Sequence, residues 1–217
     1  MPADPVLTVN EIFYSLQGES LYAGLPCVFV RLTGCNLRCS YCDTTYAYAS
    51  GTVLSIRNIL DQTRQYQCRL FEITGGEPLC QPNTPALVDA LLSAGYTVLM
   101  ETNGTRDIRM VDSRCIKILD IKCPGSGESD KNDFENLNRL SANDQVKFVI
   151  TDRADYEFAK PAARKMAAEL SWPVLFSPAT PLLAPRKLAE WILSDRLPVR
   201  LQLQLHKILW PEQEKGK

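Results

Sequence analysis

The sequence has a single histidine, no excess of either charge and no long apolar run. With 24 basic and 25 acidic residues, the formal net charge is −1, so nothing in the electrostatics favours binding to nucleic acid or to an anionic membrane. No segment approaches the ~20 consecutive apolar residues that a membrane-spanning helix needs. The N-terminus also lacks the basic and apolar regions of a secretory signal, and we therefore expect a cytoplasmic protein.

The 217 residues are 45% hydrophobic and 23% charged, and we expect residues 1–217 to form one domain with a sizeable core. The eight cysteines are more than the average for this length. A small secreted protein would use them for disulfides, but this chain is too long and too apolar to need such a framework. In a reducing compartment, the same count indicates metal or redox chemistry.

Three of the cysteines form a C-x3-C-x2-C triplet made of Cys35, Cys39 and Cys42. A structural zinc site usually takes four ligands in two pairs, but no second pair is present and His206 lies far along the chain. A 4Fe–4S cluster held by three thiolates keeps one iron open to a small molecule. The spacing favours such an open cluster, and leaves zinc with a distant fourth cysteine, or unligated thiols, as alternatives. The other five cysteines fit small buried side chains: Cys27, Cys68, Cys80, Cys115 and Cys123.

Short apolar runs alternate with amphipathic stretches along the chain. We expect strands at 27–32, 69–73, 97–101, 116–121, 146–150, 173–176 and 199–203. We expect helices at 56–66, 85–93, 133–140, 152–170 and 185–193, the fourth kinked or split at Pro161. This order indicates an α/β fold with parallel strands and right-handed crossovers. Since a complete barrel typically needs ~250 residues, we predict a partial β/α barrel, or an open curved sheet, of about six parallel strands.

Polar segments follow four of the expected strands directly. The cysteine loop, residues 33–50, follows the first strand, and residues 74–78 follow the second. Residues 101–104 follow the third, and residues 120–122 end the fourth. In parallel sheets of this kind, binding and catalysis gather at the carboxyl ends of the strands. We therefore expect these segments to form one site.

The cysteine loop, with Tyr41 just before its last cysteine, resembles that of the radical S-adenosylmethionine (SAM) superfamily, and Thr74–Pro78 resembles the second motif of that superfamily. The resemblance implies a radical SAM core with a 4Fe–4S cluster on Cys35, Cys39 and Cys42. The open iron would bind the amino and carboxylate groups of SAM, and electron transfer would release a 5′-deoxyadenosyl radical. The implied SAM-binding residues are Tyr41, Thr74, Gly75, Gly76, Glu77, Glu101, Asn103, Lys122 and Ser126.

A narrower resemblance covers nearly the whole chain. Residues 11–20, Cys42-Asp43-Thr44 and Gln204-x-His206-Lys207 resemble the 7-carboxy-7-deazaguanine synthase family. The family converts 6-carboxy-5,6,7,8-tetrahydropterin to 7-carboxy-7-deazaguanine with release of ammonia, on the way to queuosine. The resemblance implies a homodimer that depends on Mg²⁺ and takes electrons from an external, flavodoxin-like donor.

The same resemblance implies a substrate site whose N-terminal part is the extension at residues 1–26. Glu19 and Gln17 would accept hydrogen bonds from the guanidine-like edge of the pterin, and Arg31 would bind its carboxylate. Thr44 matches the Mg²⁺ ligand of the family, and no residue is assigned as a catalytic acid or base. The implied substrate-binding residues are Leu16, Gln17, Gly18, Glu19, Arg31 and His206.

Two alternatives share some of these features. A glycyl-radical-enzyme activase would have the same cysteine loop and a similar size, but it lacks the Gln17-Gly18-Glu19 segment. A zinc-bound structural or interaction module would use the cysteines alone, and the ordered Gly75-Gly76-Glu77-Pro78 segment argues against it.

Overall fold

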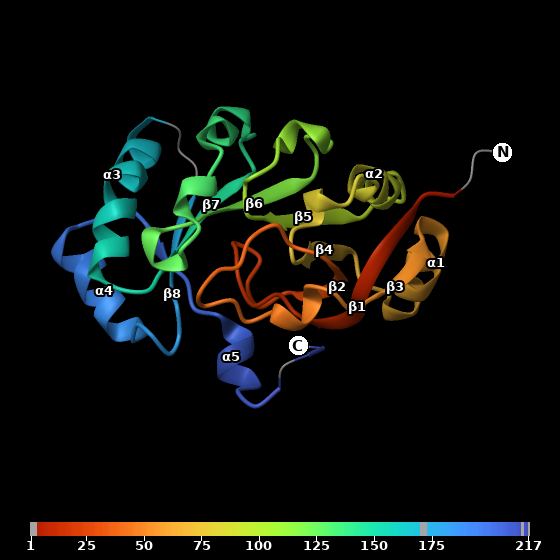
Figure 1. Ribbon diagram of the computed structural model, residues 1–217, viewed down its shortest axis with the longest axis horizontal. Helices are drawn as coiled ribbons and strands as arrows, with labels where there is room; N and C mark the ends of the chain where they lie inside the picture. Colours follow the sequence, from red (N-terminus) through yellow and green to blue (C-terminus); the bar gives the residue numbers. More distant parts are fainter. Residues whose placement is uncertain (1–3, 170–172, 214, 217) are drawn as a thin grey trace.

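The computed structural model describes residues 4–169, 173–213 and 215–216. Within these ranges nine strands form one sheet in the order β3-β1-β2-β4-β5-β6-β7-β8-β9 (Figure 1). The strands are β1 (Val6–Leu16), β2 (Pro26–Leu32), β3 (Thr52–Ser55), β4 (Leu70–Gly75), β5 (Thr97–Thr102), β6 (Ile116–Ile121), β7 (Gln145–Ile150), β8 (Val174–Pro178) and β9 (Arg200–Leu201). From β2 to β9 every neighbouring pair is parallel. The predicted partial barrel is confirmed, with seven parallel strands.

Four of the expected helices are α-helices, with small changes at their ends: α1 (Ile56–Thr63), α2 (Thr84–Ser93), α3 (Arg153–Glu169) and α4 (Pro185–Ser194). The predicted end of the third of these, residue 170, lies outside the described residues. The short helix α5 (Leu205–Leu209) was not predicted. Ser55 caps α1 by accepting from Asn58 N at 3.2 Å. Pro161 lies inside α3 without splitting it, and the predicted helix at 133–140 is a 3-10 helix, Phe134–Arg139. None of the helices in the described ranges is long and apolar enough to cross a membrane.

Two strands were not predicted from the sequence, and both lie on one side of β2. Strand β1 pairs antiparallel with β2 and with β3, so the N-terminal segment belongs to the sheet itself. Its apolar alternation is weak because a register shift between Val9 and Glu11 interrupts it. Leu7 and Val9 are buried in the main core, whereas Phe13 stacks on Phe29 in the apolar cluster inside the barrel, so the buried residues of β1 lie on different faces before and after the shift.

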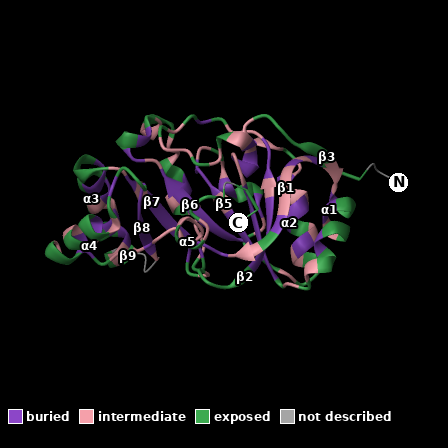
Figure 2. Ribbon diagram, turned by 90° about the horizontal axis from the view of Figure 1, so that it is seen from below, coloured by how far each residue is buried: buried purple, intermediate pink, exposed green. Residues whose placement is uncertain are grey.

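The parallel strands are buried on both faces, but the two faces differ (Figure 2). One face packs on the helices and holds the main apolar core, for example Ile73, Met100 and Phe148. Because side chains alternate along a strand, the intervening residues point into the barrel. At the amino ends they are apolar, as Phe29 and Leu99 are. At the carboxyl ends the interior positions carry a buried charged layer, which consists of Glu72, Glu101, Asp120 and Lys147.

Candidate active site

A cavity of about 780 Å³ opens at the carboxyl ends of the parallel strands. The turn after β1, the loop after β2, the ends of β4 to β7 and the C-terminal segment around α5 all contribute to its wall. The structure thus brings together nearly all of the residues expected at the site. The predicted residues that line the cavity are Leu16, Gln17, Gly18, Glu19, Arg31, Cys35, Cys39, Tyr41, Cys42, Thr44, Thr74, Gly75, Gly76, Glu101, Asn103, Lys122 and His206.

The three cysteines of the loop are free, partly buried and on the cavity wall. Burial raises the pKa of Cys35 and Cys39 above the usual value for a thiol. Among the described residues, no three His, Cys, Asp or Glu side chains converge in a way that would hold a single metal ion. Three thiols from one loop, all on the wall of a cavity, are the donor set of a 4Fe–4S cluster that keeps one iron open to a small molecule.

Gly75 and Gly76 hold the near end of the cysteine loop against β4. Gly76 N donates to Leu32 O at 3.2 Å, and Glu77 N donates to Gly34 O at 2.8 Å. A Cβ on Gly75 would lie 2.1 Å from Leu32 O, and one on Gly76 would lie 2.1 Å from Gly34 O. Both glycines are thus required by the close approach of two backbone segments.

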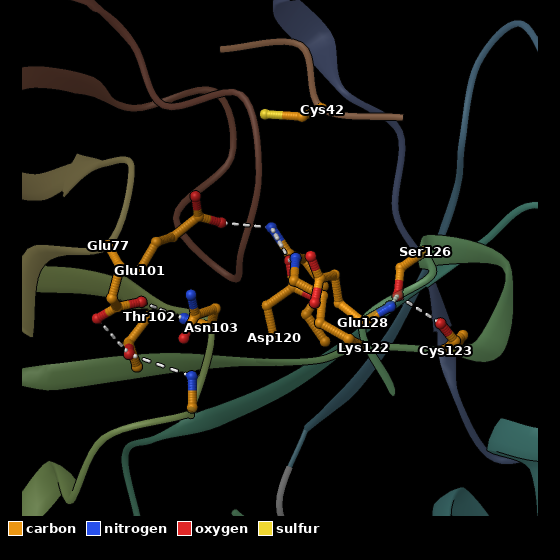
Figure 3. A network of polar contacts seen from close by, with 12 residues as sticks. Cys42, Glu77, Glu101, Thr102, Asn103, Asp120, Lys122, Cys123, Ser126 and Glu128 are labelled. Carbon is orange, nitrogen blue, oxygen red and sulfur yellow. Dashed lines mark hydrogen bonds and ion pairs between the residues drawn. The ribbon is translucent and has the colours of Figure 1, made fainter. Parts of the chain in front are cut away.

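Ser126, predicted to bind the cofactor, lies outside the cavity lining and is fully buried. Its hydroxyl donates to Cys123 O at 2.6 Å and accepts from Glu128 N at 3.1 Å (Figure 3). Its carbonyl accepts from Ser40 N at 3.0 Å. The hydrogen bonds of the side chain thus lie within its own turn, and a direct contact of Ser126 with SAM stays a prediction. Through its carbonyl, Ser126 also holds the far end of the cysteine loop.

For Glu77, too, the predicted contact with the cofactor stays a prediction. Its carboxylate is fully buried outside the cavity lining and accepts from Leu79 N at 3.0 Å, Thr102 Oγ1 at 2.9 Å and Asn103 N at 2.6 Å (Figure 3). Burial raises its pKa above the usual value, and the hydrogen bonds oppose that shift. Glu77 therefore ties the segment after β4 to the end of β5.

We expect Glu77→Gln to lower the free energy of unfolding by about 1–3 kcal/mol, because an amide group in place of one oxygen leaves a buried backbone or hydroxyl donor without an acceptor. Urea unfolding followed by circular dichroism measures the change. Glu135→Gln is a control, since Glu135 is exposed. Equal stability of the two variants would contradict the assigned role.

Two buried oxygens on the cavity wall have no partner among the described residues, the hydroxyl of Tyr41 and Oδ1 of Asp120. The other oxygen of Asp120 pairs with Lys122 Nζ at 2.8 Å, and that ammonium lies 5.9 Å from the centre of the Tyr41 ring. Buried polar groups normally find a partner. This part of the wall therefore fits a polar ligand that supplies the missing hydrogen bonds, as a SAM molecule would.

The Gln17–Glu19 turn is fixed from several sides. Glu19 accepts from Gln204 Nε2 at 2.9 Å, and its backbone N–H donates to Gln17 Oε1 at 3.0 Å. Gln17 Nε2 donates in turn to Glu72 on β4. Leu205 N donates to Gly18 O at 3.1 Å, and a Cβ on Gly18 would lie 2.9 Å from His206 Nδ1. The C-terminal segment therefore closes over the turn that follows β1.

Arg31 and Thr44 lie on the same wall as the cysteines. Arg31 Nε pairs with Glu11 at 2.7 Å, and its guanidinium carbon lies 5.6 Å from the centre of the Phe13 ring and 5.8 Å from that of Tyr46. The hydroxyl of Thr44 lies 3.7 Å from Cys42 Sγ. Asp43 next to it pairs with Lys207 at 2.8 Å, and Lys207 outweighs burial to lower the pKa of Asp43.

Sequence reasoning assigned no role to Glu72, Asp120 or Lys147 of the charged layer, although all of them line the cavity. The sequence did contain a feature that could have identified these three residues. Each is a charged residue at an interior position of a strand that was expected to be buried on both faces, and buried charges are rare unless they are paired. The wall also includes Ala179 and Thr180 after β8, which had no such feature, and Lys207 after β9, which belongs to the C-terminal segment that carries the family resemblance.

The fold and the cysteine loop define the class. Residues 29–119 match the model of the radical SAM superfamily, so the protein is a radical SAM enzyme, a class that binds a 4Fe–4S cluster and SAM.

The relatives define the family. The chain is 44% identical to the 7-carboxy-7-deazaguanine synthase of Koribacter versatilis, over 97% of this chain and 100% of that one. It is 44% identical to that of Chlorobaculum tepidum over 100% of both chains. The crystal structure of QueE from Escherichia coli superposes with a TM-score of 0.72 at 23% identity, covering 92% of this chain and 94% of that one, and shows the same fold. The chain belongs to the 7-carboxy-7-deazaguanine synthase family, which displaces the zinc module and the activase as interpretations.

Proposed function

We propose that this enzyme converts 6-carboxy-5,6,7,8-tetrahydropterin to 7-carboxy-7-deazaguanine and ammonia. The observation that carries the proposal is a single cavity in which a partly buried carboxylate, Glu19, and a partly buried guanidinium, Arg31, line the same wall as the three loop cysteines. A carboxypterin needs both groups, since it has hydrogen-bond donors on its guanidine-like edge and a carboxylate on the other ring. Full-length relatives that bear the name of this enzyme support the proposal.

Glu19 is suited to accept hydrogen bonds from the pterin edge. Burial alone would raise its pKa, but Lys147 and Gln204 outweigh burial and lower the pKa to about 2. It is therefore ionised at neutral pH. Since Oε1 receives one hydrogen bond from Gln204 and a carboxylate oxygen accepts about two, Glu19 retains capacity for the substrate.

The substrate carboxylate would meet Arg31 and Mg²⁺. Because Arg31 uses Nε for Glu11, its terminal nitrogens would contact the substrate. Thr44 is the residue we assign to Mg²⁺, together with substrate oxygens and water, since Mg²⁺ commonly keeps several waters and borrows substrate oxygens. When bound, the cluster and SAM supply the 5′-deoxyadenosyl radical that removes hydrogen from the carboxylate-bearing carbon. The chain itself binds and orients the pterin and keeps water out.

Anaerobic reconstitution tests the proposal. The reconstituted protein, given a reductant, SAM, Mg²⁺ and the carboxypterin, is expected to form a deazaguanine that mass spectrometry detects. Cleavage of SAM without a deazaguanine would show that the pterin is not the substrate.

We also propose a homodimer, an external flavodoxin-like electron donor and a cytoplasmic location, all as implied by the family.

Thr44→Ala is expected to reduce the Mg²⁺-stimulated rate by about tenfold or more, because one metal ligand is lost, while the visible spectrum of the cluster is unchanged. Activity measured against Mg²⁺ concentration checks this. Thr45→Ala is the neighbouring control and should keep the Mg²⁺ response. A Thr44→Ala protein with a normal Mg²⁺ response would rule out Thr44 as the ligand.

A further inference from the structure

Lys147 is the residue whose ammonium group lies close to three carboxylates of the cavity wall. Its ammonium lies 2.9 Å from Glu19 Oε2, 2.5 Å from Glu101 Oε1 and 3.8 Å from Asp120 Oδ2. These carboxylates come from the turn after β1 and from the ends of β5 and β6, so one side chain on β7 links three other segments. The lysine side chain is 5% exposed and lines the cavity.

The register of the sheet explains why the lysine reaches these partners. Asp120 and Lys147 are directly paired residues of neighbouring parallel strands, so their side chains point to the same face. Glu101 lies on the next strand along and pairs with Ile118, two residues before Asp120, so its side chain points to the same face. Glu19 reaches the group from the turn, where Gln202 and Gln204 also donate to its carboxylate at 3.1 Å and 2.9 Å.

The charge balance of the group depends on this one ammonium. Burial opposes the charge of Lys147, but Glu101 and Glu19 outweigh it and raise the lysine pKa well above its usual value. Burial raises the pKa of Glu101, and Lys147 opposes that shift. Burial and the nearby Glu101 raise the pKa of Glu72 well above the usual value for a carboxyl. Without the lysine, several carboxylates would share a desolvated space, and among the described residues no other lysine or arginine forms a salt bridge with Glu19 or Glu101.

We propose that Lys147 is a positioning residue for the pterin: it fixes Glu19 and Glu101 in one arrangement on the cavity wall and thereby sets how tightly the enzyme binds its substrate. This inference rests on the proposed function. Lys147 acts through these carboxylates, and because Glu19 is the one expected at the pterin while Glu101 is expected at SAM, removing the lysine should weaken the binding of the pterin more than it slows the cleavage of SAM.

The test compares Lys147→Met with the wild-type enzyme, both reconstituted with the cluster. The KM for the carboxypterin is expected to rise about tenfold or more, since a hydrogen bond to a buried charged group is lost. The iron content is expected to match the wild type, and the rate of SAM cleavage without pterin is expected to fall less than the affinity for the pterin. Lys147→Arg, which keeps the charge, should recover part of the affinity.

The pH dependence gives a readout that a purely structural role would not move. Removing Lys147 removes the charge that lowers the pKa of Glu19 and opposes the rise in that of Glu101. Both pKa values should therefore rise, and the acid limb of kcat/KM for the pterin should move to higher pH. The charged or titratable groups that make up or face this cluster are Glu19, Asp43, Glu72, Glu101, Asp120, Lys122 and His206.

Lys117→Met is the matched control. Lys117 is also a buried, paired lysine, with Asp144 at 3.3 Å, but it lies outside the cavity lining. This variant should lose stability and keep the wild-type KM for the pterin. Lys147→Gln, which removes the charge with less loss of polarity, is the second variant in case Lys147→Met does not fold.

The outcomes are separable. Absence of a deazaguanine from the wild-type enzyme contradicts the proposed function itself. A wild-type enzyme that turns over the pterin, beside a Lys147→Met or Lys147→Gln enzyme whose KM is unchanged, overturns the role of Lys147. Equal losses of iron, SAM cleavage and pterin turnover overturn it too, as does the failure of both variants to fold, because the lysine would then serve the fold alone.

Discussion

Cys39→Ala is expected to abolish SAM cleavage, whereas Cys80→Ala is expected to retain it. The first change removes one of the three thiols that line the cavity, and a cluster held by the remaining two cysteines would leave two irons without protein ligands. The loss should be complete within the sensitivity of the assay. Iron content, the visible spectrum and 5′-deoxyadenosine formation measure it.

Cys80 is the matched control because its side chain contacts the cysteine loop without belonging to it. Its thiol donates to Asn36 Oδ1 at 3.5 Å, yet it lies outside the cavity lining. If Cys80 supplied a fourth ligand, Cys80→Ala would change the visible spectrum of the cluster. That result would contradict a cluster with one iron free of protein ligands. Normal iron content in Cys80→Ala, with SAM cleavage intact, supports a cluster on three cysteines.

Gly76→Ala is expected to have the second-largest effect, although glycine carries no functional group. The new Cβ would lie 2.1 Å from Gly34 O and 2.8 Å from Cys35 Cβ. Since the first of these atoms is backbone, the start of the cysteine loop must move. Overpacking of this kind costs about 3 kcal/mol or more, and we expect both the thermal midpoint and the iron content after reconstitution to fall well below the wild type.

Gly24→Ala separates crowding from backbone strain. Gly24 has a φ of +89°, and a Cβ added there would meet no heavy atom within 4 Å, so alanine adds strain of about 1–2 kcal/mol and no clash. This variant should lose some stability and reconstitute its cluster normally. Full iron content in Gly76→Ala would show that the loop tolerates the displacement.

The sequence was most informative about features that depend on residues close together in the chain. Alternating apolar runs and helical periodicity depend on neighbouring residues, so the parallel strands and the main helices were predicted close to their observed bounds. Strand β1 was missed because its register shift interrupts the alternation. The triplet of cysteines was recognisable because all its members lie within one short loop.

Side-chain roles at the strand ends required the tertiary structure. Glu77 was expected at the cofactor because it follows two glycines, but its carboxylate turns toward Thr102 and Asn103. The glycines themselves serve the contact between β4 and the cysteine loop. Proximity in sequence placed these residues in the right region, and the direction of each side chain depended on partners from another strand.

By itself, the sequence determined the class of fold, the cysteine loop and the edge of the sheet at which the site lies, because each follows from local periodicity or spacing. Only the tertiary structure decided that Lys147 meets Glu19 and Glu101, which are 128 and 46 residues away from it. Such contacts depend on strand order and register, and these are set by the packing of the whole sheet rather than by any one segment.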